Sequence, residues 1–316
     1  MKTARIFVVT GATSGLGLEA VKSLCENPTH HVLVGAREPN KATALAALVR
    51  AGQVRVIPLD TSSLKSVDRF ADAVTDEIGP DGRIAGLANN AGLQIFGDEL
   101  SADGYDMTFA ANYLGHFKLT HLLLDRLAPG AAVVTTASGT HDPNDRLARR
   151  FNFRGGLFPN AAAVATGTLS SDGDVAQTGR DRYATSKLCC VLMTKEMARR
   201  VPAGRARFIA FDPGLMPGTN LARQFPAPVR FAWHKVMPAM ARVWPGVSSA
   251  SQSGAALAKL LSDKNLAPGT GLHMDYGLRH TNPSRDAQRE DLMAELYAFS
   301  RQAIETAQAK RPYRTA

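Results

Sequence analysis

Tyr183 and Lys187 lie four residues apart in the segment DRYATSKLCCVLMTKEMARR. On a helix this spacing places a phenol and an ammonium group on one face, one turn apart. A tyrosine donates protons efficiently when its pKa falls from about 10 by roughly two to three units, or about 3 to 4 kcal/mol. An ammonium group at about 4 Å supplies about 4 kcal/mol. We therefore predict an acid–base pair in which Lys187 lowers the pKa of Tyr183, although ordinary surface helices also show this spacing.

A glycine-rich segment, TGATSGLG, follows the first apolar run and precedes a helix-like pattern. Its glycines allow a tight turn and close approach to a pyrophosphate, and a helix N-terminus offers unpaired N–H groups. This context predicts a dinucleotide-binding loop, although a glycine run by itself is a common turn. The predicted cofactor-binding residues are Gly11, Thr13, Ser14, Gly15, Leu16 and Gly17.

The second apolar run ends in HVLVGAR, and Arg37 follows Gly17 by about twenty residues. An acidic side chain at this point accepts a hydrogen bond from a free ribose 2′-hydroxyl, whereas an arginine accommodates a 2′-phosphate. Ala36 and Arg37 stand here without an acid. The sequence therefore predicts NADP(H) rather than NAD(H). The alternative is an exposed arginine at a strand end.

Apolar strand-like runs alternate with helix-like segments along the chain, beginning RIFVVTG, GLGLEAVKSLCEN, HVLVGAR, KATALAALVRAG and VRVIPLD. Continuous apolar strands that alternate with helices indicate a parallel sheet covered on both faces. We predict a single α/β domain over 1–306, with a Rossmann-like doubly wound sheet. Two irregular segments interrupt the pattern, an insert at about 139–182 and a second segment at about 215–247, and 307–316 is expected to be a basic flexible tail.

The composition excludes several classes of protein. The 316 residues are 45% hydrophobic and 21% charged, and no apolar run approaches the roughly 20 residues that span a bilayer. The apolar run in MKTARIFVVTGATSG is short and leads into the glycine loop, so we expect no signal peptide and a cytoplasmic location. The net charge of +9 comes from scattered basic residues, which argues against nucleic acid. Cys25, Cys189 and Cys190 show no metal-type spacing, so no metal is expected.

Six motifs occur together and in order: TGATSGLG, LANNAG at 87–92, Asn112 in AANYLGHF, Ser138 in VVTTAS, YATSK at 183–187 and DPG at 212–214. Together they resemble the short-chain dehydrogenase/reductase superfamily over about residues 5–302. The segments around Arg37, Asn112 and Tyr183 look most like its retinol dehydrogenase and protochlorophyllide reductase branch.

The resemblance implies further residues of the nucleotide site. Asp60 and Thr61 would lie at the adenine, with Asp60 holding its amino group, and Asn90 would tie neighbouring strands together. Gly218 stands where the family often has the threonine that bonds the carboxamide, so Thr219 is a looser match. The remaining implied contacts are Asn89, Ala91 and Gly92 at the adenosine ribose, and Pro213, Gly214 and Thr219 at the nicotinamide.

The resemblance also implies a catalytic set. A hydride that reaches a carbonyl carbon leaves negative charge on the oxygen, which must receive a proton. Tyr183 would be the acid, Ser138 would hold the oxygen, and Lys187 would hold the nicotinamide ribose. Asn112 would connect Lys187 to solvent through its backbone carbonyl and a water. The alternatives are a strand-end hydroxyl for Ser138 and a mid-helix polar residue for Asn112.

The segment from Val229 to Trp244 has apolar residues at helical spacing, with basic residues on its other faces. It is predicted to be a helix that covers the domain, a lid over a lipophilic substrate or a surface resting on anionic lipid. The predicted substrate contacts are Leu215, Met216, Trp233 and Met237.

Together these observations predict NADPH-dependent reduction of a bulky apolar ketone or aldehyde, or the reverse alcohol oxidation. One alternative is a carbon–carbon double-bond reductase of the protochlorophyllide reductase type, but Leu215 stands where that branch carries a proposed proton-donating cysteine. A non-catalytic NADP(H)-binding regulator and a membrane-peripheral lipid enzyme are the others. Related proteins pair through the helices that carry Asn112 and Tyr183, so a homodimer is expected unless the insert obstructs it.

Overall fold

The computed structural model describes residues 4–169, 174–217, 244 and 246–309. A parallel sheet of seven strands forms its centre, in the order β3-β2-β1-β4-β5-β6-β7. The chain starts in the middle of the sheet, moves to one edge, returns, and then builds the other edge. This doubly wound topology confirms the predicted fold class. The strands are β1 Arg5–Thr10, β2 His30–Ala36, β3 Val54–Pro58, β4 Ile84–Asn89, β5 Leu127–Thr136, β6 Ala206–Asp212 and β7 Leu272–Asp275.

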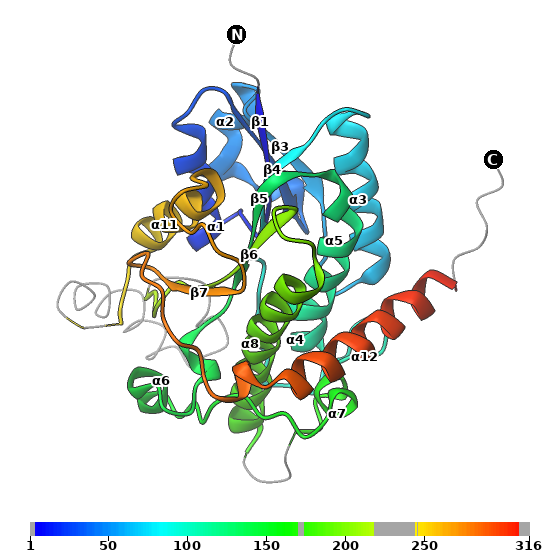
Figure 1. Ribbon diagram of the computed structural model, residues 1–316, viewed down its shortest axis with the longest axis vertical. Helices are drawn as coiled ribbons and strands as arrows, with labels where there is room; N and C mark the ends of the chain where they lie inside the picture. The colour runs from blue at the N-terminus through cyan, green and yellow to red at the C-terminus, as the bar shows by residue number, and fades with distance from the viewer. Residues whose placement is uncertain (1–3, 170–173, 218–243, 245, 310–316) are drawn as a thin grey trace.

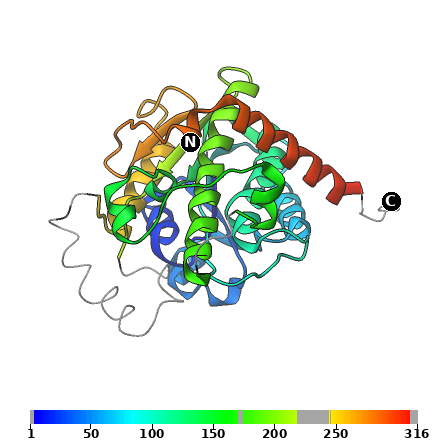
Figure 2. The ribbon, with the colours of Figure 1, turned by 90° about the horizontal axis from the view of Figure 1, so that it is seen from below.

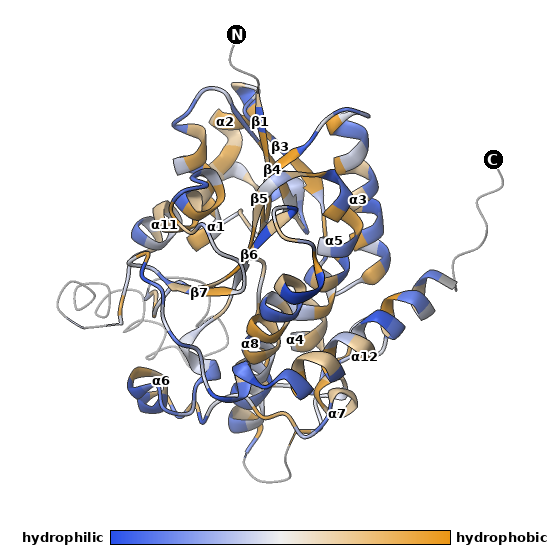
Figure 3. Ribbon diagram, in the orientation of Figure 1, coloured by the Kyte–Doolittle hydropathy of each residue, from blue (hydrophilic) through white to orange (hydrophobic). Residues whose placement is uncertain are grey.

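Helices cover both faces of the sheet, and each face has its own apolar core (Figure 1). On one face α1 (Gly15–Cys25) packs against α11 (Ala250–Ser262), with α2 (Ala46–Arg50) beside β3. On the other face lie α3 (Leu64–Ile78), α5 (Gly115–Leu123) and the long α8 (Val175–Arg200). The strands carry hydrophobic residues, as their burial on both faces requires, while the outer side of α3 is hydrophilic (Figure 3).

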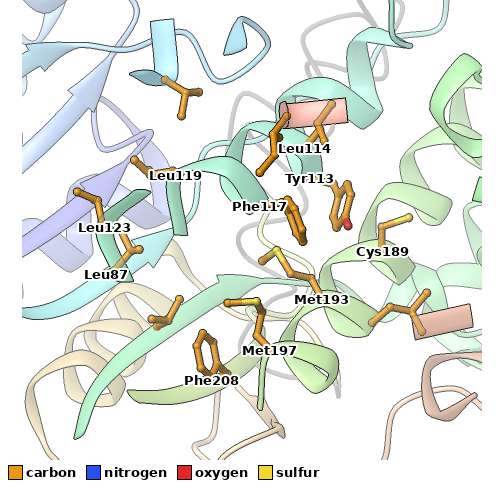
Figure 4. Packing of buried hydrophobic residues seen from close by; sticks show 14 of the residues in the cluster. Leu87, Tyr113, Leu114, Phe117, Leu119, Leu123, Cys189, Met193, Met197 and Phe208 are labelled. Carbon is orange, nitrogen blue, oxygen red and sulfur yellow. The ribbon is translucent and has the colours of Figure 1, made fainter. Parts of the chain in front are cut away.

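The core under α5 and α8 is built from large side chains. Tyr113 and Phe117 lie against Cys189 and Met193 of α8, and Met197 lies against Phe208 of β6 (Figure 4). All six side chains are buried. This packing fixes the height and rotation of α8 relative to the sheet, and so it fixes where Tyr183 and Lys187 point.

The last helix, α12 (Glu290–Ala309), packs along α8, and its C-terminal end projects from the body (Figures 1 and 2). The Tyr113 hydroxyl is hydrogen-bonded to Ser300 at 2.8 Å, and the Tyr297 ring packs against Phe117 with centroids 5.4 Å apart. The outward faces of α5 and α8 are therefore partly covered by the chain itself.

The structure differs from the predicted elements in three places. The helix that carries Tyr183 begins at Val175, where Asp174 accepts a hydrogen bond from the Gln177 N–H, so the irregular insert ends earlier than residue 182. The helix expected within 41–52 is two 3-10 turns and the short α2. The helix before β5 contains a π turn at Ala110–Leu114. The remaining short elements are η1 Pro39–Lys41, η2 Thr43–Leu45, α4 Met107–Phe109, η3 Ala110–Leu114, η4 Leu124–Arg126, η5 Gly139–His141, α6 Arg146–Arg150, α7 Ala161–Thr166 and η8 Asp286–Gln288.

Candidate active site

A cavity of about 700 Å³ opens at the carboxyl ends of the strands. It begins at the glycine loop after β1, passes the ends of β4 and β5, and reaches the ends of β6 and β7. In doubly wound sheets, ligands bind at this edge, where the strand order reverses. Two sides are named from here on: the nucleotide side, lined by residues 11–17, 35–37, 59–61 and 90–92, and the substrate side, lined by the insert and the ends of β6 and β7.

The nucleotide side depends on glycines that cannot carry a side chain. Gly11 has φ +69°, and a Cβ atom on it would lie 2.6 Å from the Cα of Ala91. A Cβ on Gly17 would lie 2.6 Å from both the Gly11 carbonyl oxygen and the Asn90 amide nitrogen. The loop can therefore pack this closely only because Gly11 and Gly17 have no side chain. Gly15 and Leu16, at the N-terminus of α1, line the cavity together with Thr13 and Ser14, so a helix N-terminus faces any anion bound there.

Arg37 lines the far end of the nucleotide side and is exposed. Within the described residues its guanidinium group has no ion pair or side-chain hydrogen bond, whereas the nearby Lys41 is paired with Glu38. Asp60 and Thr61 line the same end, and an Asp60 carboxylate oxygen accepts from the N–H and hydroxyl of Ser62.

The structure corrects the prediction for Asn89 and agrees with the prediction that Asn90 ties neighbouring strands together. Asn89 does not line the cavity: it is 1% exposed, and its amide nitrogen donates to the hydroxyls of Thr120 and Thr135. Asn90 lines the cavity instead, and its amide nitrogen donates to the carbonyls of Thr10 and Gly11. Asn89 is the last residue of β4 and points into the core, because successive strand residues face opposite sides. Ala91 and Gly92 line the cavity as expected.

Tyr183, Ser138 and Lys187 meet in the middle of the cavity wall. Ser138 follows the end of β5, and its hydroxyl is hydrogen-bonded to Tyr183. The Lys187 Nζ lies 5.6 Å from the centre of the Tyr183 ring and donates to the Thr136 carbonyl at 2.9 Å. Tyr183 is 8% exposed and Lys187 is 4% exposed, so their polar atoms reach only this cavity. The predicted helical spacing therefore does bring the phenol and the ammonium group to one site.

Burial shifts the pKa of Tyr183 in the direction opposite to the prediction. Desolvation raises the pKa of this phenol above its ordinary value, the charges of Cys190 and Asp212 add to the rise, and only the hydrogen bond with Ser138 lowers it. Burial also lowers the pKa of Lys187. The expectation that Lys187 lowers the pKa of Tyr183 considered only the charge, whereas in this buried site desolvation is the larger effect.

Asn112 holds two segments of the site together. Its side-chain amide accepts from the Leu93 N–H at 2.8 Å and donates to the Leu93 carbonyl and the Ser186 hydroxyl, both at 2.9 Å. Its backbone carbonyl, predicted to serve a water near Lys187, already accepts hydrogen bonds from His116 at 3.0 Å and from Cys190 at 3.4 Å. The structure thus assigns Asn112 a positioning role through its side chain.

His116 continues this network toward the nucleotide side. Its Nε2 is hydrogen-bonded at 2.9 Å to the Thr10 hydroxyl, which also accepts from the N–H groups of Asn90 and Ala91. Burial lowers the pKa of His116 from 6.5 to about 4, so the imidazole is neutral in the folded protein. A neutral ring can donate to Asn112 and accept from Thr10 at the same time.

After β6, the cavity is lined by Leu215 and Met216, which are predicted substrate contacts, and by Pro213 and Gly214, which are predicted contacts of the nicotinamide. The predicted residues Thr219, Trp233 and Met237 and almost all of the 229–244 segment lie outside the described residues. Sequence reasoning missed most of the lining on the substrate side, because it comes from loops without a motif. Of the residues that were missed, only Asp212 could have been found from the sequence, because it belongs to the DPG motif at 212–214. The missed residues that matter below are Gln94, Phe153, Arg180, Asp212 and His273.

The described part of the chain shows neither a membrane-spanning helix nor a metal-binding cluster. None of its helices is long and apolar enough to cross a membrane. Among the same residues, no group of three or more His, Cys, Asp or Glu side chains is arranged to hold a metal ion. The three cysteines are free and buried.

Comparison with known proteins gives consistent matches. Residues 5–145 match the family model described as short chain dehydrogenase. The chloroplastic protochlorophyllide reductase A of Oryza sativa subsp. japonica is 33% identical over 287 residues, which cover 84% of this chain and 71% of that protein. Retinol dehydrogenase 13 of Homo sapiens is 27% identical over 303 residues, which cover 94% of this chain and 83% of that protein.

Among solved structures, an uncharacterized protein from Mycobacterium paratuberculosis superposes with a TM-score of 0.67. It is 28% identical in sequence, and the match covers 96% of this chain and 94% of that chain. The relatives named above come from the two groups that the sequence motifs resemble, and the matched regions span both the nucleotide side and the substrate side.

Proposed function

This chain belongs to the short-chain dehydrogenase family of oxidoreductases, and we propose that it uses NADPH to reduce a ketone or aldehyde, with Tyr183 as the general acid. The observation that carries the proposal is the convergence of Tyr183, Ser138 and Lys187 on one enclosed cavity that continues into the glycine loop.

The nucleotide side fits a phosphate-bearing dinucleotide. Gly11 and Gly17 leave a bare backbone beside the N-terminus of α1, which suits a pyrophosphate. Arg37 offers a guanidinium group with no partner in the described residues, which suits a 2′-phosphate and supports NADP(H) over NAD(H). Asp60, Ala91 and Gly92 would complete the adenosine end. When bound, the reduced nicotinamide supplies the hydride.

The chain's own residues would control the oxygen of the substrate. Ser138 and Tyr183 both present hydroxyl groups, so a carbonyl oxygen between them receives two hydrogen bonds and is fixed in place. A tyrosine phenol with its ordinary pKa of about 10 is protonated at neutral pH, which is the form that reduction requires, and burial shifts the pKa of Tyr183 further upward. The proton then passes from this phenol to the developing alkoxide, and the positive charge of Lys187 stabilises the phenolate that remains.

A second candidate is reduction of a carbon–carbon double bond, favoured by the 33% identity to a protochlorophyllide reductase. This reaction needs the same hydride geometry but places the proton on carbon. Leu215 at the start of the segment after the Pro-Gly turn has no proton to give, which supports carbonyl reduction. Product analysis with an unsaturated ketone separates the two, because an allylic alcohol and a saturated ketone are distinct products.

Replacing Tyr183 by Phe tests the proposal. We expect the rate of NADPH-dependent ketone reduction to fall by about a hundredfold to ten-thousandfold, because the acid is lost. NADPH binding, measured by fluorescence titration, should not change. Tyr105→Phe is the matched control, since the Tyr105 ring packs against Phe109 and Phe299 away from the cavity lining. A Tyr183→Phe enzyme with most of its rate would exclude the assigned role.

A further inference from the structure

The segment after β4 runs alongside α8 at the level of Tyr183. At one end, a Cβ atom built on Gly92 would lie 3.7 Å from the Nζ of Lys187. At the other end, a Cβ on Gly179 would lie 2.5 Å from the Phe96 ring and 2.8 Å from the Ile95 carbonyl. The segment thus follows α8 from Lys187 back to Gly179, and Gln94 lies between these contacts.

Gln94 brings an unpaired amide to this place. It is 5% exposed and lines the cavity, yet its Nε2 has no hydrogen-bond partner among the residues that the structure describes. A buried polar group left without a partner costs about 1–3 kcal/mol, so native proteins rarely keep one without a use. The neighbouring Leu93 is clamped by the Asn112 side chain, which holds the backbone before Gln94 in place.

Arg180 follows Gly179 on α8 and so brings a positive charge next to the contact between Gly179 and Ile95. It lies three residues before Tyr183, so both side chains lie on one face of α8, and it lines the cavity. Its Nε donates to the Gln177 side chain at 3.2 Å, and it forms no ion pair within the described residues. The adjacent acid, Asp181, is already paired with Arg154 at 2.6 Å.

Other arginines of α8 are paired. Arg182 contacts Asp98 and Asp106, and Arg199 and Arg200 contact Glu196. Arg180 therefore differs from them both in facing the cavity and in keeping its charge uncompensated by an acid in the described residues. A guanidinium group pairs best with the planar, two-oxygen shape of a carboxylate.

We propose that Gln94 and Arg180 form a subsite for a carboxylate of the substrate, so that the enzyme reduces oxo acids whose carbonyl lies at Tyr183. The inference rests on the proposed function and narrows its substrate class. Gln94 and Arg180 each adjoin a residue of the Ile95–Gly179 contact, one from each segment, and both line the cavity that also holds Tyr183. The carboxylate receives the charge of Arg180 and the amide donor of Gln94.

The rest of the lining determines which way the substrate lies. Acidic residues also line the cavity, but on other elements: Asp145 caps α6, Asp212 accepts from the Gly214 N–H, and Asp275 is paired with Arg279. Asp145 and Asp212 would repel a carboxylate from the end of β6, whereas the charge of Asp275 is compensated by Arg279. The apolar Leu147, Phe151 and Phe153 of the insert would instead hold the hydrophobic body of the substrate.

The test compares aryl-substituted 2-oxo, 4-oxo and 5-oxo acids with their methyl esters, which keep the carbonyl and remove the charge. We expect the wild-type enzyme to show a higher kcat/KM for at least one acid than for its ester. Arg180→Met should lower kcat/KM for that acid by about 10- to 100-fold, because a charge-assisted pair contributes about 1.5–3 kcal/mol. Its effect on the ester should stay within about threefold.

Two further variants sharpen the result. Arg180→Lys should recover part of the acid rate, and Gln94→Met should lower it by about three- to tenfold, since one neutral hydrogen bond is lost. Arg50→Met removes an exposed positive charge outside the cavity lining and should leave the acid-to-ester ratio unchanged. The subsite is wrong if Arg180→Met lowers kcat/KM equally for the acid and the ester. It is also wrong if this variant leaves the acid-to-ester ratio of kcat/KM unchanged.

Failure of the subsite and failure of the proposed function give different results. If the wild-type enzyme reduces the esters but prefers no acid, the subsite is wrong and carbonyl reduction stands. If it reduces neither, the proposed function is wrong, and the subsite is judged by binding. In that case the acid should raise the Tm of the NADPH-bound wild-type protein more than the ester does, and Arg180→Met should abolish the difference; equal Tm shifts would reject the subsite.

Discussion

The nucleotide side and the substrate side of the cavity are built in different ways. The nucleotide side consists of backbone held by close contacts, such as Gly17 against Gly11 and Asn90. The backbone N–H groups of Asn90 and Ala91 also donate hydrogen bonds to the Thr10 hydroxyl. The substrate side consists of side chains from the insert and from strand ends, among them Phe153, Asp212 and His273. The first arrangement tolerates almost no change in shape, whereas the second can change residue by residue. We therefore expect substitutions on the two sides to alter different measurements.

The largest effect is expected from adding a methyl group to the glycine loop. In Gly17→Ala the new Cβ would lie 2.6 Å from both the Gly11 carbonyl oxygen and the Asn90 side-chain nitrogen. Neither atom can move away unless the loop moves. Overpacking of this kind costs about 1–3 kcal/mol of stability, and we expect NADPH affinity to fall by about a hundredfold as the loop shifts. Fluorescence titration and chemical denaturation measure the two losses.

Gly97→Ala is the control for this change, because a Cβ there meets nothing within 4 Å. It should leave both stability and NADPH affinity unchanged. If Gly17→Ala bound NADPH normally, the description of the nucleotide side as rigid backbone would be wrong.

The next effect concerns His116, whose two ring nitrogens are hydrogen-bonded to the Thr10 hydroxyl and to the Asn112 carbonyl. Burial lowers the pKa of His116 from 6.5 to about 4, so the unfolded chain takes up a proton more readily than the folded protein. Neutral His116 therefore makes its full contribution to the free energy of unfolding above pH 6.5, and this contribution is lost as the pH falls from 6.5 to about 4. The loss amounts to about 3 kcal/mol.

Urea denaturation of the wild-type protein and of His116→Gln between pH 7 and pH 4 tests this expectation. A glutamine can still donate and accept but does not titrate in this range. The variant should lose less stability on acidification than the wild type. Parallel pH profiles for the two proteins would show that His116 does not carry the dependence.

A smaller effect is expected at Arg37, where the nucleotide side uses a side chain. Arg37→Ala should weaken NADPH binding by about 10- to 100-fold through the loss of charge-assisted hydrogen bonds, with NADH binding almost unchanged. Titration with each nucleotide measures the preference, and Arg50→Ala serves as the charge-matched control. A preserved NADPH preference would assign the 2′-phosphate to another residue.

The smallest effect is expected from Phe153→Ala on the substrate side. The Phe153 ring lies 6.0 Å from the Tyr183 ring, centre to centre, and lines the cavity. Its loss should raise KM for an aryl ketone by about three- to tenfold, or about 1 kcal/mol, through lost apolar contact. NADPH affinity should stay constant. A changed NADPH affinity would contradict the separation of the two sides.

Sequence reasoning reached the fold and most of the nucleotide side because their causes are local. Continuous apolar strands, bare glycines and a residue spacing of four each predict one geometry, and the strand order, the loop around Gly11 and the meeting of Tyr183 with Lys187 agree with those predictions. The burial of Asn89 could not be predicted, since a shift of one residue along a strand end decides which side chain enters the core.

The substrate side could not be predicted because its residues become neighbours only through tertiary packing. Gln94 and Arg180 lie 86 positions apart in the sequence and come together where Ile95 packs on Gly179. The direction of the Tyr183 pKa shift failed for a related reason: the charge of Lys187 can be read from the spacing, but the depth of burial cannot.

The packing of α12 on α8 also has a consequence for how the protein is made. Ser300, whose hydroxyl is bonded to Tyr113, follows it by 187 positions, and α12 also packs on α8, so these surfaces stay uncovered until the chain has been synthesised beyond residue 300. Pairings over such long stretches of chain form slowly. We expect a nascent chain halted before residue 290 to bury its nucleotide loop but to leave Tyr183 in a loosely ordered centre, a difference that proteolysis of stalled ribosome complexes can measure. Synthesis of α12 would then be the step that orders the site around Tyr183.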